Sequence, residues 1–127
     1  MVGCAGGADA FVRAAAPGAA VFSVRPPLSR TAFARRSAQL VLAVFSARGV
    51  IVVFPSAPCP TGLAPSSSAS ACFCGLGSGS WASAAFAVGL GLPVAVFPCG
   101  FSALPPWGSW VPAGFGFWSG GFRLVAA

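Results

Sequence analysis

Residues 71 to 81 read ACFCGLGSGSW and hold the side chains that could most readily do chemistry in this chain. Cys72 and Cys74 could offer thiolates to a zinc ion, together with the more distant Cys59 and Cys99. Structural zinc sites instead present two ligand pairs, each separated by roughly two to four residues, and this chain has one close pair only. The spacing therefore predicts no metal-ligating residue.

Disulfide bonds are no better supported by the sequence. The chain has five cysteines, so at least one thiol would stay unpaired. No clear signal peptide directs the chain to an oxidising compartment, where disulfides persist. The redox state of the cysteines is therefore left open.

The alternating glycines of the same stretch raise the question of a phosphate-binding loop. A dinucleotide-binding loop requires G-x-G-x-x-G between a strand and a helix, with an acidic residue about twenty positions later. Gly75, Gly77 and Gly79 have a different spacing, no acidic residue follows them, and the chain has no lysine for a P-loop. We expect no cofactor and no cofactor-binding residue.

The residue types present in the chain argue against catalysis. General acid–base catalysis uses groups that exchange protons near neutral pH, usually His, Glu, Asp or Lys. The chain contains none of these except Asp9. Serine and cysteine nucleophiles need a base to activate them, and arginine stays protonated. The sequence predicts that the chain is not an enzyme and has no catalytic residue.

The overall composition is far from that of a typical soluble domain. Charged residues make up 6% of the chain, and 57% of its residues are hydrophobic, whereas typical globular proteins are about 25% charged. Glycine, proline and serine account for 44 of the 127 residues, and the first two interrupt helices and strands. We therefore expect no stable globular fold, but a largely irregular, low-complexity, disordered and self-associating chain.

One helix is predicted within this irregular chain, over residues 28 to 48. Ala, Leu, Arg and Gln favour helix there, Ser29 or Thr31 could cap its start, and Gly49 could end it. The β-branched run VIVVF at residues 50 to 54 predicts either a short strand or the tail of an apolar stretch. These are the only regular elements that the local pattern supports.

The distribution of charge divides the chain into two segments. Residues 1 to 48 are rich in Arg and Ala and hold six of the seven arginines, whereas residues 49 to 127 are charge-poor and rich in Gly, Pro, Ser and aromatic residues. Residues 55 to 71 are expected to form a loop or disordered segment. From residue 93 to 121 we expect no strand of useful length, and no fixed register for the aromatic side chains.

A membrane-associated protein is the alternative that the sequence supports. Residues 81 to 99, WASAAFAVGLGLPVAVFPC, carry no charge and approach the roughly 20 residues that span a bilayer. The excess of arginines before this segment predicts a cytoplasmic N-terminus. Gly89, Gly91 and Pro93 weaken the helix that spanning would require.

The arginines of the N-terminal segment admit two further interpretations. An Arg-, Ala- and Ser-rich N-terminus is typical of an organelle transit peptide, and a basic stretch can contact nucleic-acid phosphates. The segment contains no recognised nucleic-acid-binding motif, so no specific nucleic-acid partner is predicted. Localisation is left open between these alternatives and the membrane.

A genetic pattern unites the missing residues. Tyr, His, Gln, Asn, Lys, Asp and Glu all have adenine in the middle of their codons, and this chain contains only Asp9 and Gln39 from that group. The coding strand is therefore poor in adenine. Because every stop codon contains adenine, a frame on such a strand stays open without selection. The leading hypothesis is a spurious product of a chance or antisense reading frame, with no identifiable biochemical function.

Overall fold

The computed structural model describes residues 2–3, 8–23, 29–76 and 78–125 of the chain. Its elements along the chain are β1 (Val2–Gly3), α1 (Ala8–Ala15), β2 (Val21–Phe22), α2 (Arg30–Ser46), β3 (Ile51–Val53), α3 (Ala69–Cys72), α4 (Gly79–Gly89), β4 (Val94–Val96), β5 (Ser109–Pro112), the 3₁₀ helix η1 (Gly116–Trp118) and β6 (Phe122–Val125). The strands form a parallel pair of β1 and β2 and a four-stranded mixed sheet of order β3-β4-β6-β5.

The four-stranded sheet combines a parallel and an antiparallel half. β3 runs parallel to β4, with Ile51 opposite Val94, and the connection between them carries α3 and α4. β6 runs antiparallel to both β4 and β5, and the hairpin of β5 and β6 places Trp110 opposite Leu124. β4 is buried along its whole length because it has a strand on each side and α4 beneath it.

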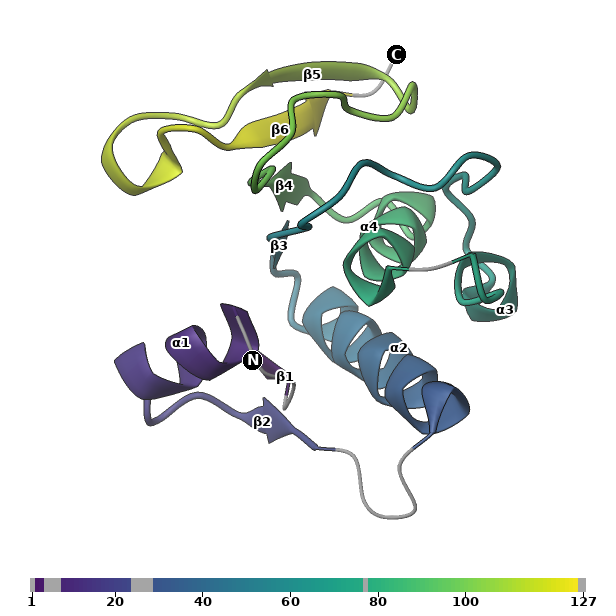
Figure 1. The fold of residues 1–127 in the computed structure, drawn as a ribbon. Helices are drawn as coiled ribbons and strands as arrows, with labels where there is room; N and C mark the ends of the chain where they lie inside the picture. Colours follow the sequence, from purple (N-terminus) through teal and green to yellow (C-terminus); the bar gives the residue numbers. More distant parts are fainter. Residues whose placement is uncertain (1, 4–7, 24–28, 77, 126–127) are drawn as a thin grey trace.

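The core lies where α4 is enclosed between the sheet and α2 (Figure 1). α4 is built largely from alanine, and its small side chains allow close packing on several sides at once. The buried core comprises, in the main, Val41, Val44, Ile51, Val53, Trp81, Ala84, Ala85, Phe86, Ala87, Val94 and Val96. The expectation of a chain without a stable globular fold is therefore wrong, because short apolar elements bury one another despite the glycines and prolines between them.

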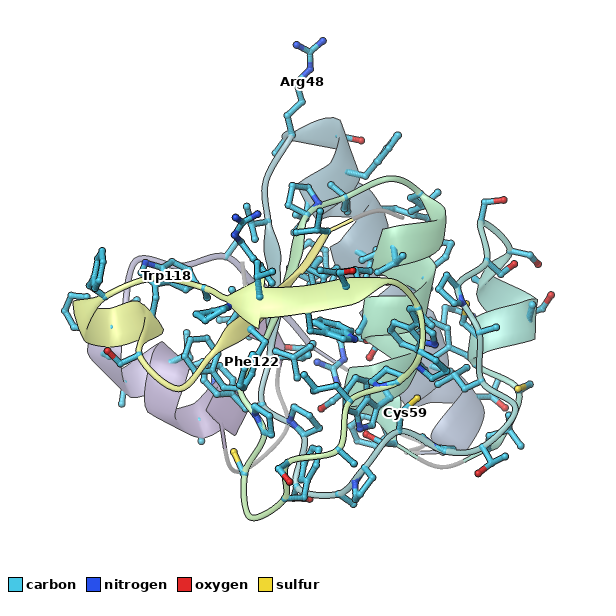
Figure 2. The ribbon with its side chains drawn as sticks, turned by 90° about the horizontal axis from the view of Figure 1, so that it is seen from above. Arg48, Cys59, Trp118 and Phe122 are labelled. Atoms are coloured by element: carbon cyan, nitrogen blue, oxygen red, sulfur yellow. The ribbon has the colours of Figure 1, made fainter. Side chains whose placement is uncertain are left out.

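α2 is the helix expected over residues 28 to 48. The hydroxyl of Ser29 accepts a hydrogen bond from the N–H of Ala32 at 3.0 Å, and so caps the start of the helix. The helix does not end in the way that Gly49 suggested. Arg48 instead takes the left-handed conformation, with φ of 56°, which glycine usually occupies at a helix end. Its side chain projects away from the molecule (Figure 2).

The segment from residue 55 to 71 is ordered against the core, which corrects the expectation of disorder. Leu63 is buried, and the N–H of Ser66 donates to the carbonyl of Ala85 in α4 at 3.3 Å. Gly89 allows this approach, because a Cβ atom at that position would overlap the backbone of Ser66. Up to Ser68 the chain is an irregular loop that is fixed in place, and α3 begins at Ala69.

Residues 93 to 121 also differ from the expectation, since they contain two of the sheet's strands, β4 and β5, and lead into β6. Aromatic contacts support this region: the ring centroids of Phe97 and Trp118 lie 6.1 Å apart, and those of Trp107 and Trp110 lie 6.3 Å apart. The aromatic side chains therefore do have a fixed register, set by pairing of β6 with β4 and β5.

Residues 81 to 99 do not form one continuous helix, so the membrane-spanning segment proposed from hydropathy is wrong. α4 ends at Gly89, Gly91 takes a positive φ of 83° in the turn that follows, and β4 begins at Val94. Within the described ranges, no helix combines the length and the apolar character that crossing a bilayer would require. The predicted division of the chain at residue 48 falls between α2 and β3 and stays a prediction.

Candidate functional site

A cavity of about 760 Å³ lies between the first half of α2, α3 and the start of α4. α2 contributes Phe33 and Arg36 to its wall, and the loop before α3 contributes Leu63. Phe73, which follows α3, and Ala82 from α4 complete a largely apolar lining. This volume is within the range of roughly 300–1,000 Å³ that is typical of small-molecule sites.

Arg36 is the only charged side chain among the described residues that line this cavity. Its guanidinium carbon lies 5.8 Å from the centre of the Phe33 ring, one turn earlier in α2, in a cation–π contact. Arg36 as a whole residue is half-buried.

The glycine-rich stretch that the sequence singled out forms part of the same wall. Gly75, Leu76, Ser78 and Gly79 line the cavity, and α4 begins at Gly79. The hydroxyl of Ser78 accepts the N–H of Trp81 at 3.3 Å and caps the helix. The stretch does not have the spacing of a dinucleotide loop, but it places the start of α4 in the wall of the same cavity as Arg36.

The cysteine thiols are poor candidates for nucleophilic chemistry. Cys72 lines the cavity and is buried, and its thiol donates to the carbonyl of Ser66 at 3.6 Å. Burial raises the pKa of Cys72, the hydrogen bond to Ser66 partly opposes this, and the nearby Cys74 raises it further. Burial also raises the pKa of Cys59. Both thiols therefore keep their protons at neutral pH, whereas the thiolate is the reactive form.

The structure keeps the four described cysteines as free thiols: Cys59, Cys72, Cys74 and Cys99. Nowhere in the described ranges do three or more His, Cys, Asp or Glu residues lie close enough together to hold a metal ion. Cys4 lies outside the described residues. The expectations that the chain binds no metal and no cofactor, and has no catalytic residue, stay predictions.

A second cavity, of about 520 Å³, lies at the far end of α2. Phe45, Arg48, Gly91 and Pro93 contribute to its wall. Because the Arg48 side chain points away from the molecule (Figure 2), its charge is not directed into this space. The cavity beside Arg36 is therefore the better candidate for a functional site.

Comparisons with known protein families, curated proteins and solved structures find no match to this chain. The function is therefore argued from the residues themselves. Among the described lining residues, the arrangement combines an apolar wall with the side chain of Arg36 and the buried thiol of Cys72. A concave, largely apolar arrangement of this kind is typical of small-molecule sites.

Proposed function

We propose that this chain is the product of a chance or antisense reading frame and has no selected biochemical function. One observation carries the proposal. Of the seven residue types whose codons have adenine in the middle position, the chain contains only Asp9 and Gln39. Base bias in a selected gene replaces lysine by arginine but leaves Asp and Glu on the surface, where their charge keeps the protein in solution. An adenine-poor coding strand accounts for the loss of acids and lysine together.

A compact core is compatible with this proposal. Apolar residues of suitable size and pattern are sufficient to form a core, without any requirement for a function. The elements that build it here are short and chemically simple: an alanine-rich helix and strands of three and four residues. An adenine-poor strand supplies the alanine, valine and phenylalanine codons of this core freely.

The chain catalyses no reaction of its own under this proposal. The cavity presents Arg36, and a guanidinium has donors only and cannot act as a general base. The Cys72 thiol beside it has a pKa raised by burial, so it lacks the thiolate that attack on a substrate would need. Both observations support the proposal through the chemistry of the groups that are present.

Self-association is the behaviour we propose for the chain in water. Phe115 and Phe117, at the tip of the hairpin between β5 and β6, are 95% and 98% exposed. Two neighbouring rings that are almost fully in water favour contact with other apolar surfaces. The net charge of +6 repels other copies, so association requires that the contact between apolar surfaces outweighs this repulsion.

The reading-frame proposal is tested on the gene. Consider the complementary DNA strand, read in the frame whose codons align with the codons of this chain. In that frame each phenylalanine codon becomes a lysine or glutamate codon, and each valine codon becomes a codon for Tyr, His, Asn or Asp. That aligned frame therefore cannot encode a protein with an ordinary hydrophobic core, so a genuine gene at this locus must use another frame. We expect a six-frame translation to show a frame whose charged and apolar residues alternate with helix or strand period.

The opposite result would be closure of every other frame by stop codons, while this frame changes mainly at synonymous sites across related genomes. That result would overturn the proposal, because it indicates selection on the protein itself. Mass spectrometry of the source cells adds a direct check at the level of the protein. Peptides ending at Arg30 or Arg48 would show that the chain is made, and the substitution pattern would then decide whether it is selected.

A further inference from the structure

We propose that two copies of this chain form a symmetric dimer in which the edge strand β3 of each copy pairs antiparallel with that of the other. This inference goes beyond the self-association proposed for the rings of Phe115 and Phe117, because it places a closed dimer on a different surface. It holds whether or not selection produced the chain.

The backbone of β3 has hydrogen-bonding groups directed away from the sheet. β3 is the end strand of the four-stranded sheet, so no strand lies on its outer side among the residues that the structure describes. The N–H of Ile51 donates to the carbonyl of Pro93 at 3.0 Å, and the carbonyl of Val53 accepts the N–H of Phe97 at 2.9 Å. Because successive residues of a strand direct these groups to opposite sides, the N–H and C=O of Val52 point to the outer side. An edge of this kind is a template for another strand.

The side chains along this edge are apolar. Val50, Val52 and Phe54 are exposed, whereas Ile51 and Val53 between them are buried in the core. Residues 49 to 122 carry no formal charge, so the net charge of +6 does not lie on the strand itself. Natural edge strands are commonly protected by lysine or proline, and β3 contains neither.

The opposite edge of the sheet is protected, which limits the assembly to two copies. That edge is β5, which ends at Pro112. The N–H of Ala113 donates to the carbonyl of Gly121 at 3.0 Å, across the hairpin that β5 forms with β6. The preceding residue, Pro112, therefore faces the outer side, and proline has no N–H to donate there. A dimer joined through β3 presents only β5 strands at its outer edges, so the sheet does not grow further.

The edge is self-complementary in an antiparallel register centred on Val52. In that register the outward N–H and C=O of Val52 pair with those of its equivalent in the second copy, and Val50 lies opposite Phe54. Residues 50 to 54 span about 17 Å. A contact of this length is smaller than the roughly 1,200–2,000 Å² of a stable interface. We therefore expect a dimer that dissociates reversibly.

The test is sedimentation velocity on the full chain with Phe115 and Phe117 both replaced by serine, so that contact between these rings is absent. We expect an equilibrium of monomer and dimer without larger species. Val52→Lys should weaken the dimer by about tenfold or more, because the two lysines would lie directly opposite each other. Val125→Lys is the matched control and should leave the dimer unchanged. Val125 and Val52 are each 38% exposed, but Val125 belongs to β6, which has a strand on both sides.

Two further variants at the same position separate backbone pairing from charge. Val52→Pro removes the N–H that points to the outer side and leaves those of Ile51 and Val53 in place, so it should weaken the dimer by about tenfold or more. Val52→Glu alone should behave as Val52→Lys does. An equimolar mixture of the Lys and Glu variants should restore a dimer, since opposite charges then face each other. Circular dichroism and urea unfolding verify that each variant keeps the fold.

Several results would overturn the inference. If the chain with both serines is monomeric at every concentration, β3 does not pair, even where the original chain associates through its rings. Equal weakening by Val52→Lys and Val125→Lys would mean that association follows net charge. A mixture of Val52→Lys and Val52→Glu that stays monomeric would mean that Val52 does not face its equivalent, and species larger than a dimer would contradict the protection of β5. None of these results bears on the reading-frame proposal, which the substitution pattern tests separately.

Discussion

The indole N–H of Trp81 donates to the carbonyl of Ala57 at 2.7 Å, across 24 positions of sequence, and the Trp81 side chain is fully buried. This bond ties the start of α4 to the irregular chain that follows β3. The Trp81 ring also meets the Trp107 ring edge-on, with centroids 5.8 Å apart. One side chain therefore anchors two segments that have no regular structure of their own.

We expect Trp81→Phe to lower the free energy of unfolding by about 2–4 kcal/mol, because it removes both a hydrogen bond and part of a fully buried ring. Trp118→Phe is the control, since Trp118 is 43% exposed and its loss should cost less than about 1 kcal/mol. Urea unfolding followed by circular dichroism measures both values. An equal decrease in the free energy of unfolding in the two variants would mean that Trp81 does not anchor these segments.

The close approach of Ser66 to α4 makes Gly89 a position where alanine should be harmful. Although alanine favours helix over glycine, its Cβ atom would overlap the Ser66 backbone, so the loop must move away from the helix. We expect Gly89→Ala to lower the free energy of unfolding by about 1–3 kcal/mol. Gly79→Ala is the matched control in the same helix, because nothing lies within 4 Å of a Cβ atom there. It should be neutral or slightly stabilising in the same urea unfolding experiment, and a stable Gly89→Ala variant would contradict the packing described here.

Arg48 marks a position where glycine should improve the fold. The N–H of Gly49 donates to the carbonyl of Val44 and the N–H of Arg48 to that of Phe45, at 3.0 and 3.1 Å. These bonds close the end of α2 with Arg48, which follows the cap residue, in the left-handed region. A side chain there is strained by about 1 kcal/mol or more. Replacing Arg48 by glycine would relieve this strain, but glycine also has more conformational freedom in the unfolded chain, which cancels part of the gain in the free energy of unfolding.

We therefore expect Arg48→Gly to raise the free energy of unfolding by about 0.5–1 kcal/mol. Arg35→Gly, in the exposed middle of the same helix, should lower it by about 1 kcal/mol. The midpoint temperature of thermal unfolding should therefore rise in Arg48→Gly and fall in Arg35→Gly. A shift to lower temperature in both would mean that the left-handed turn at residue 48 is not strained.

The parts of this fold that could be predicted from sequence are those fixed by local chemistry. α2 and its Ser29 cap follow from helix-forming residues beside a capping hydroxyl, and β3 follows from a run of β-branched residues. The rest depends on contacts between distant positions. Trp107, for example, donates to the carbonyl of Leu63 at 3.2 Å across 44 positions, and no local pattern indicates such a bond.

The apolar stretch at residues 81 to 99 shows why hydropathy alone led to the wrong structure. A helix that is apolar on all faces can lie in a membrane or in a core, and the pattern does not distinguish the two. In the folded chain, α4 is covered by α2 and the sheet, so its alanines are buried by protein. The break at Gly91, where φ is 83°, then separates the helix from β4.

The candidate site could not be predicted for a similar reason. Arg36 is one of several arginines in α2, and nothing in its spacing distinguishes it from Arg35 beside it. Its position on the face of α2 that meets the glycine-rich stretch depends on how α2 packs on α4. In that stretch, the spacing of the glycines excludes a phosphate-binding loop but does not indicate any other role. Its role as a cavity wall requires the tertiary structure.

The thiols give the chain a simple dependence of stability on pH. Burial raises the pKa of Cys72 and Cys59, so above pH 9.0, the ordinary pKa of a thiol, the unfolded chain loses protons that the folded chain keeps. The folded state then binds more protons, and its stability must fall as pH rises. The stability contributed by the buried thiols is complete below pH 9.0 and is lost above it.

This dependence can be measured cleanly because the chain has no lysine and no tyrosine, which normally titrate in the same range. We expect the urea midpoint to stay level from neutral pH and to decline above the thiol pKa. Cys72→Ala should make the decline shallower, whereas Cys99→Ala, at an exposed position, should not. An unchanged slope in Cys72→Ala would assign the dependence to groups other than this buried thiol.

The exposed rings at the hairpin tip give the last prediction. Phe115 and Phe117 are 95% and 98% exposed on η1 and the residue before it, so they add apolar surface without contributing to the core. Replacing both by serine should therefore reduce self-association and leave the free energy of unfolding within about 0.5 kcal/mol of the original value. Sedimentation velocity over a range of concentrations measures the first effect, and urea unfolding measures the second.

Phe45→Ser is the control, because that ring is 47% exposed at the end of α2 and should change association less. If the double variant associates as strongly as the original chain, the attraction between copies arises elsewhere on the surface. If the original chain is monomeric at every concentration, the proposal of self-association is wrong.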